Sequence, residues 1–164
     1  MKIMKIRLVV ALIGLAISFA LPTFAQQKDT VDPQIVQQIR TLASKYDAAF
    51  NNNDAAAVAA LYAADGAHGW HGTSHGRQAI EKSYAKYDFE RWQCSNYLTV
   101  VNRLAVGNEV RSTGTWSCTF KSGAGGPGND EGHYSWVIIR GGDSWKIRRD
   151  IMGGTAANPA GVVH

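Results

Sequence analysis

Three histidines gather in a short glycine-rich stretch of the chain. His68, His71 and His75 follow the spacing H-x-x-H-x-x-x-H between Gly66 and Gly76. Imidazoles can bind Zn²⁺ or Cu²⁺, and they can also move protons near neutral pH. The pattern equally fits three loop histidines at the rim of a pocket, because this stretch holds no carboxylate or cysteine to complete a metal site. We therefore expect no metal or other cofactor, and we keep a periplasmic metal-binding protein as an alternative.

Aromatic side chains are spread along the chain and could line a pocket. Ligand pockets are mostly apolar, with a few polar groups that fix orientation. Tyr46 is the best such group, because it lies on the apolar stripe of a predicted helix and carries a hydroxyl. The same rings could simply form the core. The full set of pocket candidates is Tyr46, Phe50, Tyr62, His68, Trp70, His71, Trp92, Trp116, Trp136 and Arg149.

Arg149 is the one charged candidate. It stands in step with Trp145 and Ile147, so simple strand alternation places its guanidinium on the apolar face, with Asp150 pointing the other way. A buried charge must be paired or must meet an anion. A bulge that turns Arg149 outward is the alternative.

The two cysteines predict a disulfide. Paired residues of an antiparallel hairpin share a constant index sum, and a turn centred on Val106-Gly107 gives a sum of about 212, which Cys94 and Cys118 match. Both cysteines fall on the apolar faces of their predicted strands, so register and face agree. Two buried free thiols are the alternative. We expect the bond to serve stability.

The N-terminal half of the chain is predicted to be mainly helical. Asp32-Pro33 is a helix start, and apolar residues recur at helical spacing up to Phe50, before three asparagines end the helix. Asp54 caps a short second helix over 55–62. A strand is predicted around 67–70, and a third helix over 78–87.

From residue 91 onward the apolar period changes from helix to strand. Strands are predicted over 91–104, 109–121, 133–140 and 144–151, with a flexible loop at 122–132. In the first of these, Trp92, Cys94, Leu98 and Val100 should share the apolar face. The order of elements predicts an α+β fold, in which helices pack on one face of a sheet that ends in a four-stranded antiparallel meander.

The first 25 residues have the three parts of a secretory signal peptide. Lys2, Lys5 and Arg7 precede an apolar run that is shorter than a membrane span, and small residues follow before Gln26. We predict a signal peptide over 1–25, one domain over 26–152 and a tail over 153–164. The protein is then exported, to the periplasm or beyond.

The charge balance argues against two classes of partner. The chain has 17 Lys and Arg against 13 Asp and Glu, and cleavage at residue 25 would leave 14 against 13. No long basic run remains. We therefore expect neither nucleic acid nor, after signal cleavage, a membrane surface as a partner.

Four motifs resemble the nuclear-transport-factor-2-like superfamily, in its SnoaL-like branch. They are residues 46–54 (YDAAFNNND), 61–65 (LYAAD), 76–80 (GRQAI) and 136–147 (WVIIRGGDSWKI), and together they span most of the chain. The resemblance implies a cone-shaped barrel, with three N-terminal helices packed on a curved, mainly antiparallel sheet that encloses a pocket.

The superfamily includes ketosteroid isomerases, and the resemblance can be followed residue by residue. Their oxyanion-binding tyrosine matches Tyr46. The position of their catalytic aspartate falls on Trp70, which cannot take a proton. Their proton abstraction therefore does not carry over, and whether this chain is an enzyme stays open.

The leading interpretation is an exported domain whose apolar pocket binds a small organic molecule, as a lyase, isomerase, hydrolase or binder. The alternative is a non-catalytic dimerisation or ligand-binding module. Such a module would associate through the outer face of its sheet, where Thr113, Thr115 and Thr119 should lie. We expect a homodimer.

Overall fold

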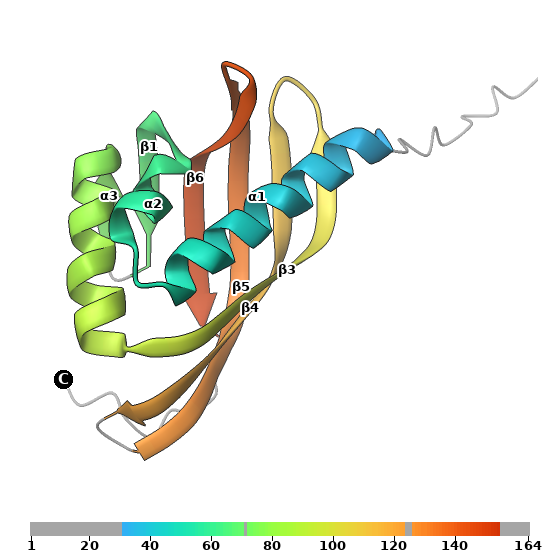
Figure 1. The fold of residues 1–164 in the computed structure, drawn as a ribbon. Coiled ribbons are helices and arrows are strands. Elements are labelled where there is room, and N and C mark those ends of the chain that lie inside the picture. Colours follow the sequence, from blue (N-terminus) through green and yellow to red (C-terminus); the bar gives the residue numbers. More distant parts are fainter. Residues whose placement is uncertain (1–30, 71, 124–125, 155–164) are drawn as a thin grey trace, which may run out of the picture.

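The computed structural model describes residues 31–70, 72–123 and 126–154. The predicted signal peptide, His71 and most of the predicted tail lie outside these ranges. Helices lie against one face of a long, strongly curved sheet (Figure 1). No helix within the described ranges is long and apolar enough to span a membrane.

Helix α1 (Pro33–Asn51) begins as the sequence predicts. The Asp32 carboxylate accepts a hydrogen bond from the Gln34 backbone N–H at 2.8 Å, and Pro33 takes the first helical position, where no N–H is needed. The helix ends before Asn53, whose φ of 54° asparagine tolerates. Its buried stripe packs on the sheet, and the core residues on it are Ile39, Leu42, Ala43, Tyr46, Ala49 and Phe50.

The next helical elements differ in length from the prediction. Helix α2 (Ala55–Ala60) stops short of residue 62, because Tyr62 opens strand β1 (Tyr62–Gly69). Helix α3 (Arg77–Ser83) runs on into η1 (Tyr84–Trp92), a π-helix of nine residues. Regular π-helices are rare and often occur at functional sites. This one turns both Tyr84 and Asp88 inward.

The sheet has six strands in the order β2-β1-β6-β5-β4-β3. Strands β3 (Cys94–Val106), β4 (Val110–Gly123), β5 (Gly126–Gly141) and β6 (Ser144–Gly154) form an antiparallel meander, while β1 pairs with β6 in parallel. The predicted α+β class and meander are confirmed. A short edge strand, β2 (Thr73–His75), was not predicted.

The predicted loop at 122–132 is wrong over most of its length. Strand β5 already pairs with β4 from Gly126, and Gly132 lies opposite Trp116. A Cβ at Gly132 would collide with the Trp116 ring and the Gly153 carbonyl, so glycine is needed for this close approach. Gly132, one of the glycines that indicated a loop, therefore serves close packing within the sheet.

A bulge at Ser95 corrects the predicted faces of β3. The register shifts between Cys94 and Asn96, so the residues that follow exchange faces. Tyr97 is buried, whereas Leu98 and Val100 are 53% and 45% exposed on the outer face.

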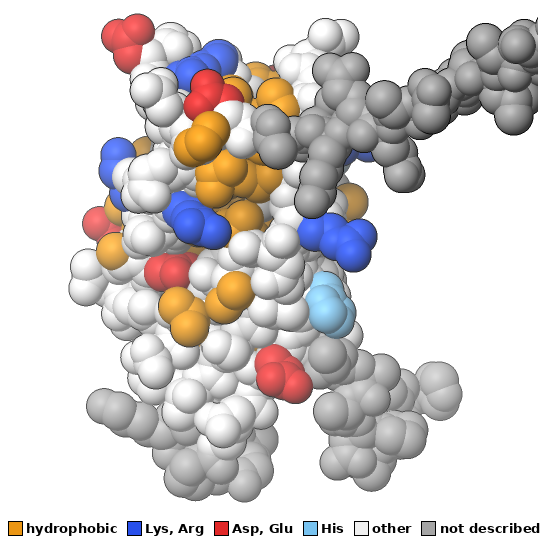
Figure 2. Space-filling view, turned by 90° about the vertical axis from the view of Figure 1, so that its right-hand side faces the viewer, with side chains coloured by type: hydrophobic (Ala, Val, Ile, Leu, Met, Phe, Trp, Pro, Cys, Tyr) orange, Lys and Arg blue, Asp and Glu red, His pale blue; other side chains and the backbone are white. Residues whose placement is uncertain are grey.

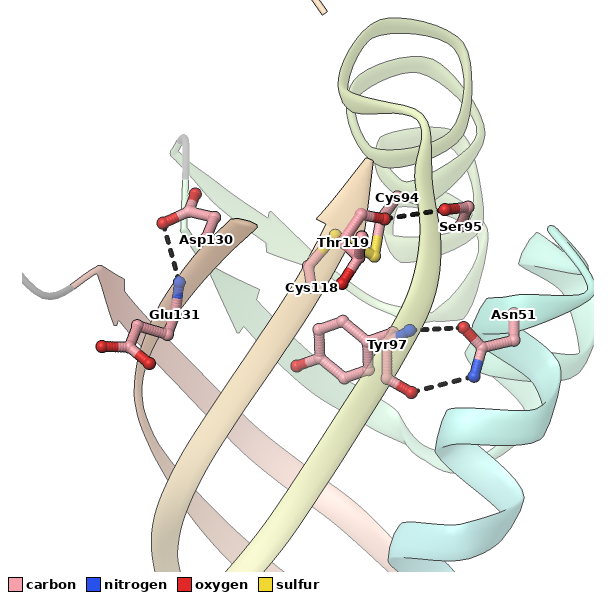
Figure 3. Close-up of a disulfide and its surroundings, with 8 residues drawn as sticks. All are labelled: Asn51, Cys94, Ser95, Tyr97, Cys118, Thr119, Asp130 and Glu131. Atoms are coloured by element: carbon pink, nitrogen blue, oxygen red, sulfur yellow. Dashed lines mark hydrogen bonds between the residues drawn. A yellow bond between two sulfur atoms is a disulfide. The ribbon is translucent and has the colours of Figure 1, made fainter. Parts of the chain in front are cut away.

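The predicted disulfide is confirmed, although the register used to predict it is wrong. Cys94 and Cys118 are bonded, with their Cα atoms 5.8 Å apart. Cys118 pairs with Tyr97 and not with Cys94, because the turn holds residues 107–109 between the paired Val106 and Val110. The bond therefore runs diagonally between the strands, next to the amide of Asn51, which exchanges two hydrogen bonds with the Tyr97 backbone (Figure 3).

Hydrophobic side chains also reach the surface next to α1. On the face drawn in Figure 2 they gather beside Lys and Arg side chains. A groove of about 450 Å³ between the start of α1 and β3 is lined by Pro33, Val36, Val101 and Leu104, with Arg40 and Arg103 beside them.

Candidate active site: a histidine–aspartate pair and three tyrosines

A buried ion-pairing contact lies where β1 meets β6. His68 and Asp150 are register partners on these parallel strands, and His68 Nδ1 lies 3.1 Å from Asp150 Oδ2. Both residues are buried, with 3% and 1% of their surface exposed. A carboxylate or imidazole that is buried away from water needs a hydrogen-bonding partner, and His68 and Asp150 serve as partners for each other.

Strand β6 aims Asp150 inward because of a second bulge. Ile138 pairs with Ile147 and Val137 with Arg149, so Arg148 is the extra residue. The bulge reverses the predicted alternation after Ile147, so Asp150 is buried and Arg149 is exposed on the outer face. The expectation that Arg149 lies on the apolar face is therefore wrong, and Asp150 lies on that face instead.

Three tyrosine hydroxyls extend this pair into a chain of hydrogen bonds. Tyr62 donates to Asp150 Oδ2 at 2.6 Å. The Tyr84 hydroxyl lies 2.8 Å from that of Tyr62 and 3.2 Å from His68 Nδ1, and the Tyr46 hydroxyl lies 2.7 Å from that of Tyr84. Because burial raises the pKa of all three tyrosines well above 10, they stay neutral and can donate.

The second carboxylate oxygen of Asp150 has no hydrogen-bond partner in the described part of the chain. Asp150 Oδ1 is buried, and no donor among the described residues reaches it. A buried acceptor without a donor costs about 1–3 kcal/mol. This atom can therefore accept a hydrogen bond from a hydroxyl of a bound molecule without giving up an existing one.

A second buried carboxyl comes from η1. Asp88 is 2% exposed, and its Oδ1 also lacks a hydrogen-bond partner in the described part of the chain. Burial raises the pKa of Asp88 from 3.8 to about 7; the charge of His68 opposes this rise and that of Asp150 adds to it. Asp88 is thus a carboxyl that can lose or gain a proton near neutral pH.

Aromatic rings surround these polar groups. The Tyr46 ring centroid is 5.2 Å from that of Trp136, that of Phe50 is 4.2 Å from that of Tyr97, and that of Trp70 is 5.2 Å from that of Trp116. The rings exclude water, and this strengthens the hydrogen bonds between the polar groups.

The structure brings together most of the candidates named from the sequence. Trp70 is partly buried against the core. Trp92 is the last residue of η1, and its side chain lies outside the described part of the structure. His71 lies outside the described residues. The candidates that are buried are Tyr46, Phe50, Tyr62, His68, Trp116 and Trp136.

The histidines do not form a common site in the described part of the chain. His75 pairs with Ala67 across β1 and β2, so it lies on the opposite face from His68, and it is exposed. Among the described residues, no group of three or more His, Cys, Asp or Glu lies close enough to hold a metal ion.

Sequence reasoning missed three members of the cluster. Tyr84 falls within the predicted third helix, but it is not among the pocket candidates. Asp88 was outside that helix, because an α-helical period ends before it, whereas the π-helix carries it inward. Asp150 was assigned to the outer face. The signal that could have found it is that Asp150 is the single acidic residue of a closing strand whose other charged residues, Lys146, Arg148 and Arg149, are all basic.

The cluster can transfer protons. With Nδ1 facing Asp150, the tautomer that carries a proton on Nδ1 is favoured, and Nε2 then has a lone pair for a ligand. Neutral tyrosine hydroxyls can donate to an oxygen that becomes negative during a reaction. A base beside oxyanion donors is the arrangement that proton abstraction next to a carbonyl requires.

Comparisons with known proteins agree with the fold. A family model described as a SnoaL-like domain matches residues 34–150. No curated protein matches the sequence. A protein of unknown function from Mycobacterium tuberculosis has a similar structure, with a TM-score of 0.64 and 18% identity over 79% of this chain and 83% of that one.

Two further solved structures have the same fold. One is an NTF2-like protein with a cystatin-like fold from Novosphingobium aromaticivorans, with a TM-score of 0.63 and 17% identity over 77% of this chain and 86% of that one. The other, from Catenulispora acidiphila, was solved in complex with S-DNPA; its TM-score is 0.62, at 14% identity over 75% of this chain and 95% of that one. With the family model spanning most of the described residues, the chain belongs to the SnoaL-like domain family, within the nuclear-transport-factor-2-like superfamily.

Proposed function

We propose that this protein is a lyase or isomerase that moves a proton on a small organic molecule, with His68 as the base. The observation that carries the proposal is the buried contact between His68 Nδ1 and Asp150 Oδ2 at 3.1 Å. The contact fixes the ring, so that Nε2 can take a proton from a substrate and return it at another atom.

Each other member of the cluster has a role in this scheme. Asp150 is a positioning residue that holds the imidazole and stabilises its charged form. The chain Tyr62–Tyr84–Tyr46 supplies hydroxyl donors. In a dry site such donors stabilise a developing oxyanion more strongly than they would in water.

The surroundings favour a carbonyl compound with an apolar ring as substrate. Aromatic rings offer apolar contact, and the hydroxyls offer donors for one oxygen. The relative from Catenulispora acidiphila in complex with S-DNPA supports a ligand-binding role for this fold. Neither a metal nor a cofactor enters the scheme.

Hydrogen–deuterium exchange tests this function. NMR would follow exchange at the carbon next to the carbonyl in a panel of small aromatic and alicyclic ketones. We expect the protein to accelerate exchange of at least one ketone, and His68→Gln to lower that rate about 100-fold or more. His75→Gln is the matched control, because His75 is exposed on β2, and its rate should not change. Equal rates in both variants would contradict the proposal.

We also propose that the protein forms a homodimer through the outer face of its sheet. Leu98, Val100 and Ile151 are 53%, 45% and 61% exposed there, in the region where Thr113 and Thr119 also face outward. Leu98 and Val100 lie on the edge strand β3 and Ile151 on β6, with β4 and β5 between them. Apolar side chains exposed on one face of a sheet are typical of interaction surfaces.

Sedimentation velocity tests the dimer. A Leu98→Arg/Val100→Arg variant should sediment as a monomer at concentrations where the wild type is a dimer. Tyr87→Arg, at an exposed apolar residue of η1, is the control and should leave the dimer intact. A monomeric wild type would refute this proposal while leaving the catalytic one untouched.

We propose that the protein is exported, with cleavage after residue 25. The Cys94–Cys118 disulfide supports this, because such bonds persist in oxidising compartments. Intact-mass measurement of the exported protein should give Gln26 as the first residue. A mass that includes the leader would overturn the assignment.

A further inference from the structure

A second hollow lies on the outside of the molecule, away from the His68–Asp150 pair. It measures about 260 Å³ and lies between α1 and the β5–β6 hairpin. Its apolar lining comes from Leu42, Leu61 and Trp145, and its charged lining includes Lys45, Arg140 and Lys146. We call it the α1–hairpin hollow. Its size is close to the lower end of the range of small-molecule sites.

Neutral partners hold two of these cations in place. The Lys146 ammonium donates to the Ala60 carbonyl at 2.7 Å, and its stem crosses Gly141 so closely that a Cβ there would lie 2.6 Å from Lys146 Cγ. Arg140 donates to Gln38 Oε1 at 3.2 Å, and its guanidinium lies 3.9 Å from the centre of the Trp145 ring. Within the described residues, both side chains are therefore held by neutral groups and not by a carboxylate.

The charge of the hollow is not balanced. Asp143 is its only acidic lining residue, and no ion pair joins a carboxylate to Lys45, Arg140 or Lys146 within the described residues. Burial lowers the pKa of Lys146, and the positive charges of Arg77 and Lys45 lower it further. An anion in this place would relieve that repulsion.

We propose that the α1–hairpin hollow binds a small organic anion, with its carboxylate between Lys45 and Lys146 and its apolar body on Leu42, Leu61 and Trp145. Charge-assisted hydrogen bonds to the two ammonium groups supply affinity for the carboxylate. The apolar floor distinguishes such a molecule from an inorganic anion. This site is independent of the proposed catalysis.

Calorimetric titration with benzoate tests the site, with benzamide and inorganic phosphate as comparisons. Benzoate should bind saturably, and benzamide, which lacks the charge, should bind about tenfold more weakly. Phosphate should also bind about tenfold more weakly than benzoate, because it has no apolar body. Tighter binding of phosphate would replace the organic anion with an inorganic one and overturn the proposal.

Charge-neutralising variants place the binding at this hollow. Lys45→Gln should weaken benzoate about tenfold, since Lys45 is exposed and its loss should not disturb folding. Lys82→Gln, an equal charge change on α3, should leave the affinity within about twofold. The Trp145 indole N–H, which donates to Gln38 Oε1 at 2.7 Å, gives an NMR signal that should shift on titration. Equal affinities in the two variants, or an unmoved Trp145 signal, would refute the site.

Discussion

The two sides of the interior are built from different chemistry. Where β1 and β6 face α3 and η1, buried polar groups meet: His68, Asp150, Tyr62 and Tyr84 share hydrogen bonds. Where β3 and β4 face α1, ring packing and a covalent bond prevail: Tyr97 stacks on Phe50, and Cys94 is bonded to Cys118. The residues named on both sides are buried. The polar contacts of α1 on the β3–β4 side go to the β3 backbone, from Asp47 and Asn51.

The difference separates stability from chemistry within one core. The β3–β4 side gains from ring packing and from a covalent bond that limits the unfolded chain. The β1–β6 side contains Asp150 Oδ1 and Asp88 Oδ1, buried oxygens that have no hydrogen-bond partner among the described residues and so destabilise the fold. On the β3 side, Asp47 Oδ1 is in the same position, but the other oxygen of Asp47 accepts a hydrogen bond from the Thr99 backbone N–H. Residues that cost stability and persist in an ordered core are candidates for function. The predictions below test this division.

The largest expected effect is that of Asp150→Ala. It leaves His68 and Tyr62 buried without their acceptor, so we expect a loss of about 3–5 kcal/mol in the free energy of unfolding. Asp150→Asn keeps the shape and should lose less. Urea denaturation followed by circular dichroism measures both. A loss below about 1 kcal/mol for Asp150→Ala would mean that the His68–Asp150 contact does not stabilise the folded protein.

Removing the disulfide should cost somewhat less. Cys94 and Cys118 close a loop with a sequence separation of 24, so Cys94→Ser/Cys118→Ser should lower the free energy of unfolding by about 3 kcal/mol. If the two sides are separate, the variant that remains folded keeps its ketone-exchange rate. A folded variant that no longer accelerates ketone exchange would contradict the division between the two sides.

Asp88 should make stability depend on pH. Its folded pKa of about 7 exceeds the ordinary value of 3.8, so between these values the folded state binds the extra proton. Stability should therefore fall as pH rises from about 4 to about 7, and then level off.

Asp88→Asn should remove this dependence, which amounts to roughly 3–4 kcal/mol of stability between about pH 4 and pH 7. Asp47 adds a smaller slope of the same sign, because burial raises its pKa to about 6. Melting temperatures across this pH range, in wild type and variant, measure the difference. A slope unchanged by Asp88→Asn would assign the dependence to other groups.

The smallest effects should come from the tyrosine chain, in a defined order. Tyr84→Phe removes a hydroxyl that lies near those of Tyr46 and Tyr62 and near His68, so we expect a loss of about 2 kcal/mol. Tyr46→Phe removes the end of the chain and should stay within about 1.5 kcal/mol of wild type while weakening ligand binding. Chemical denaturation of both variants tests the order, and a larger loss for Tyr46→Phe would contradict the chain as described.

Local rules were enough to predict much of the fold. The Asp32-Pro33 start and the Asp54 cap satisfy nearby N–H groups, so they depend on neighbouring residues alone. The four-stranded meander followed from the change in apolar period. The disulfide and the family also followed from the sequence, and Tyr46, Tyr62 and His68, which the sequence offered as pocket candidates, are buried.

Tertiary structure alone decided the composition of the candidate site. An added residue in a strand exchanges the faces of all that follow, and periodicity cannot locate it, since pairing with the neighbouring strand creates the bulge. The bulge at Arg148 thus replaced Arg149 with Asp150 in the interior, and the wider turn of η1 brought in Asp88. The sequence determined most of the elements and the buried stripe of the first helix, whereas pairing between distant strands decided which strand residues are buried and which polar atoms meet His68.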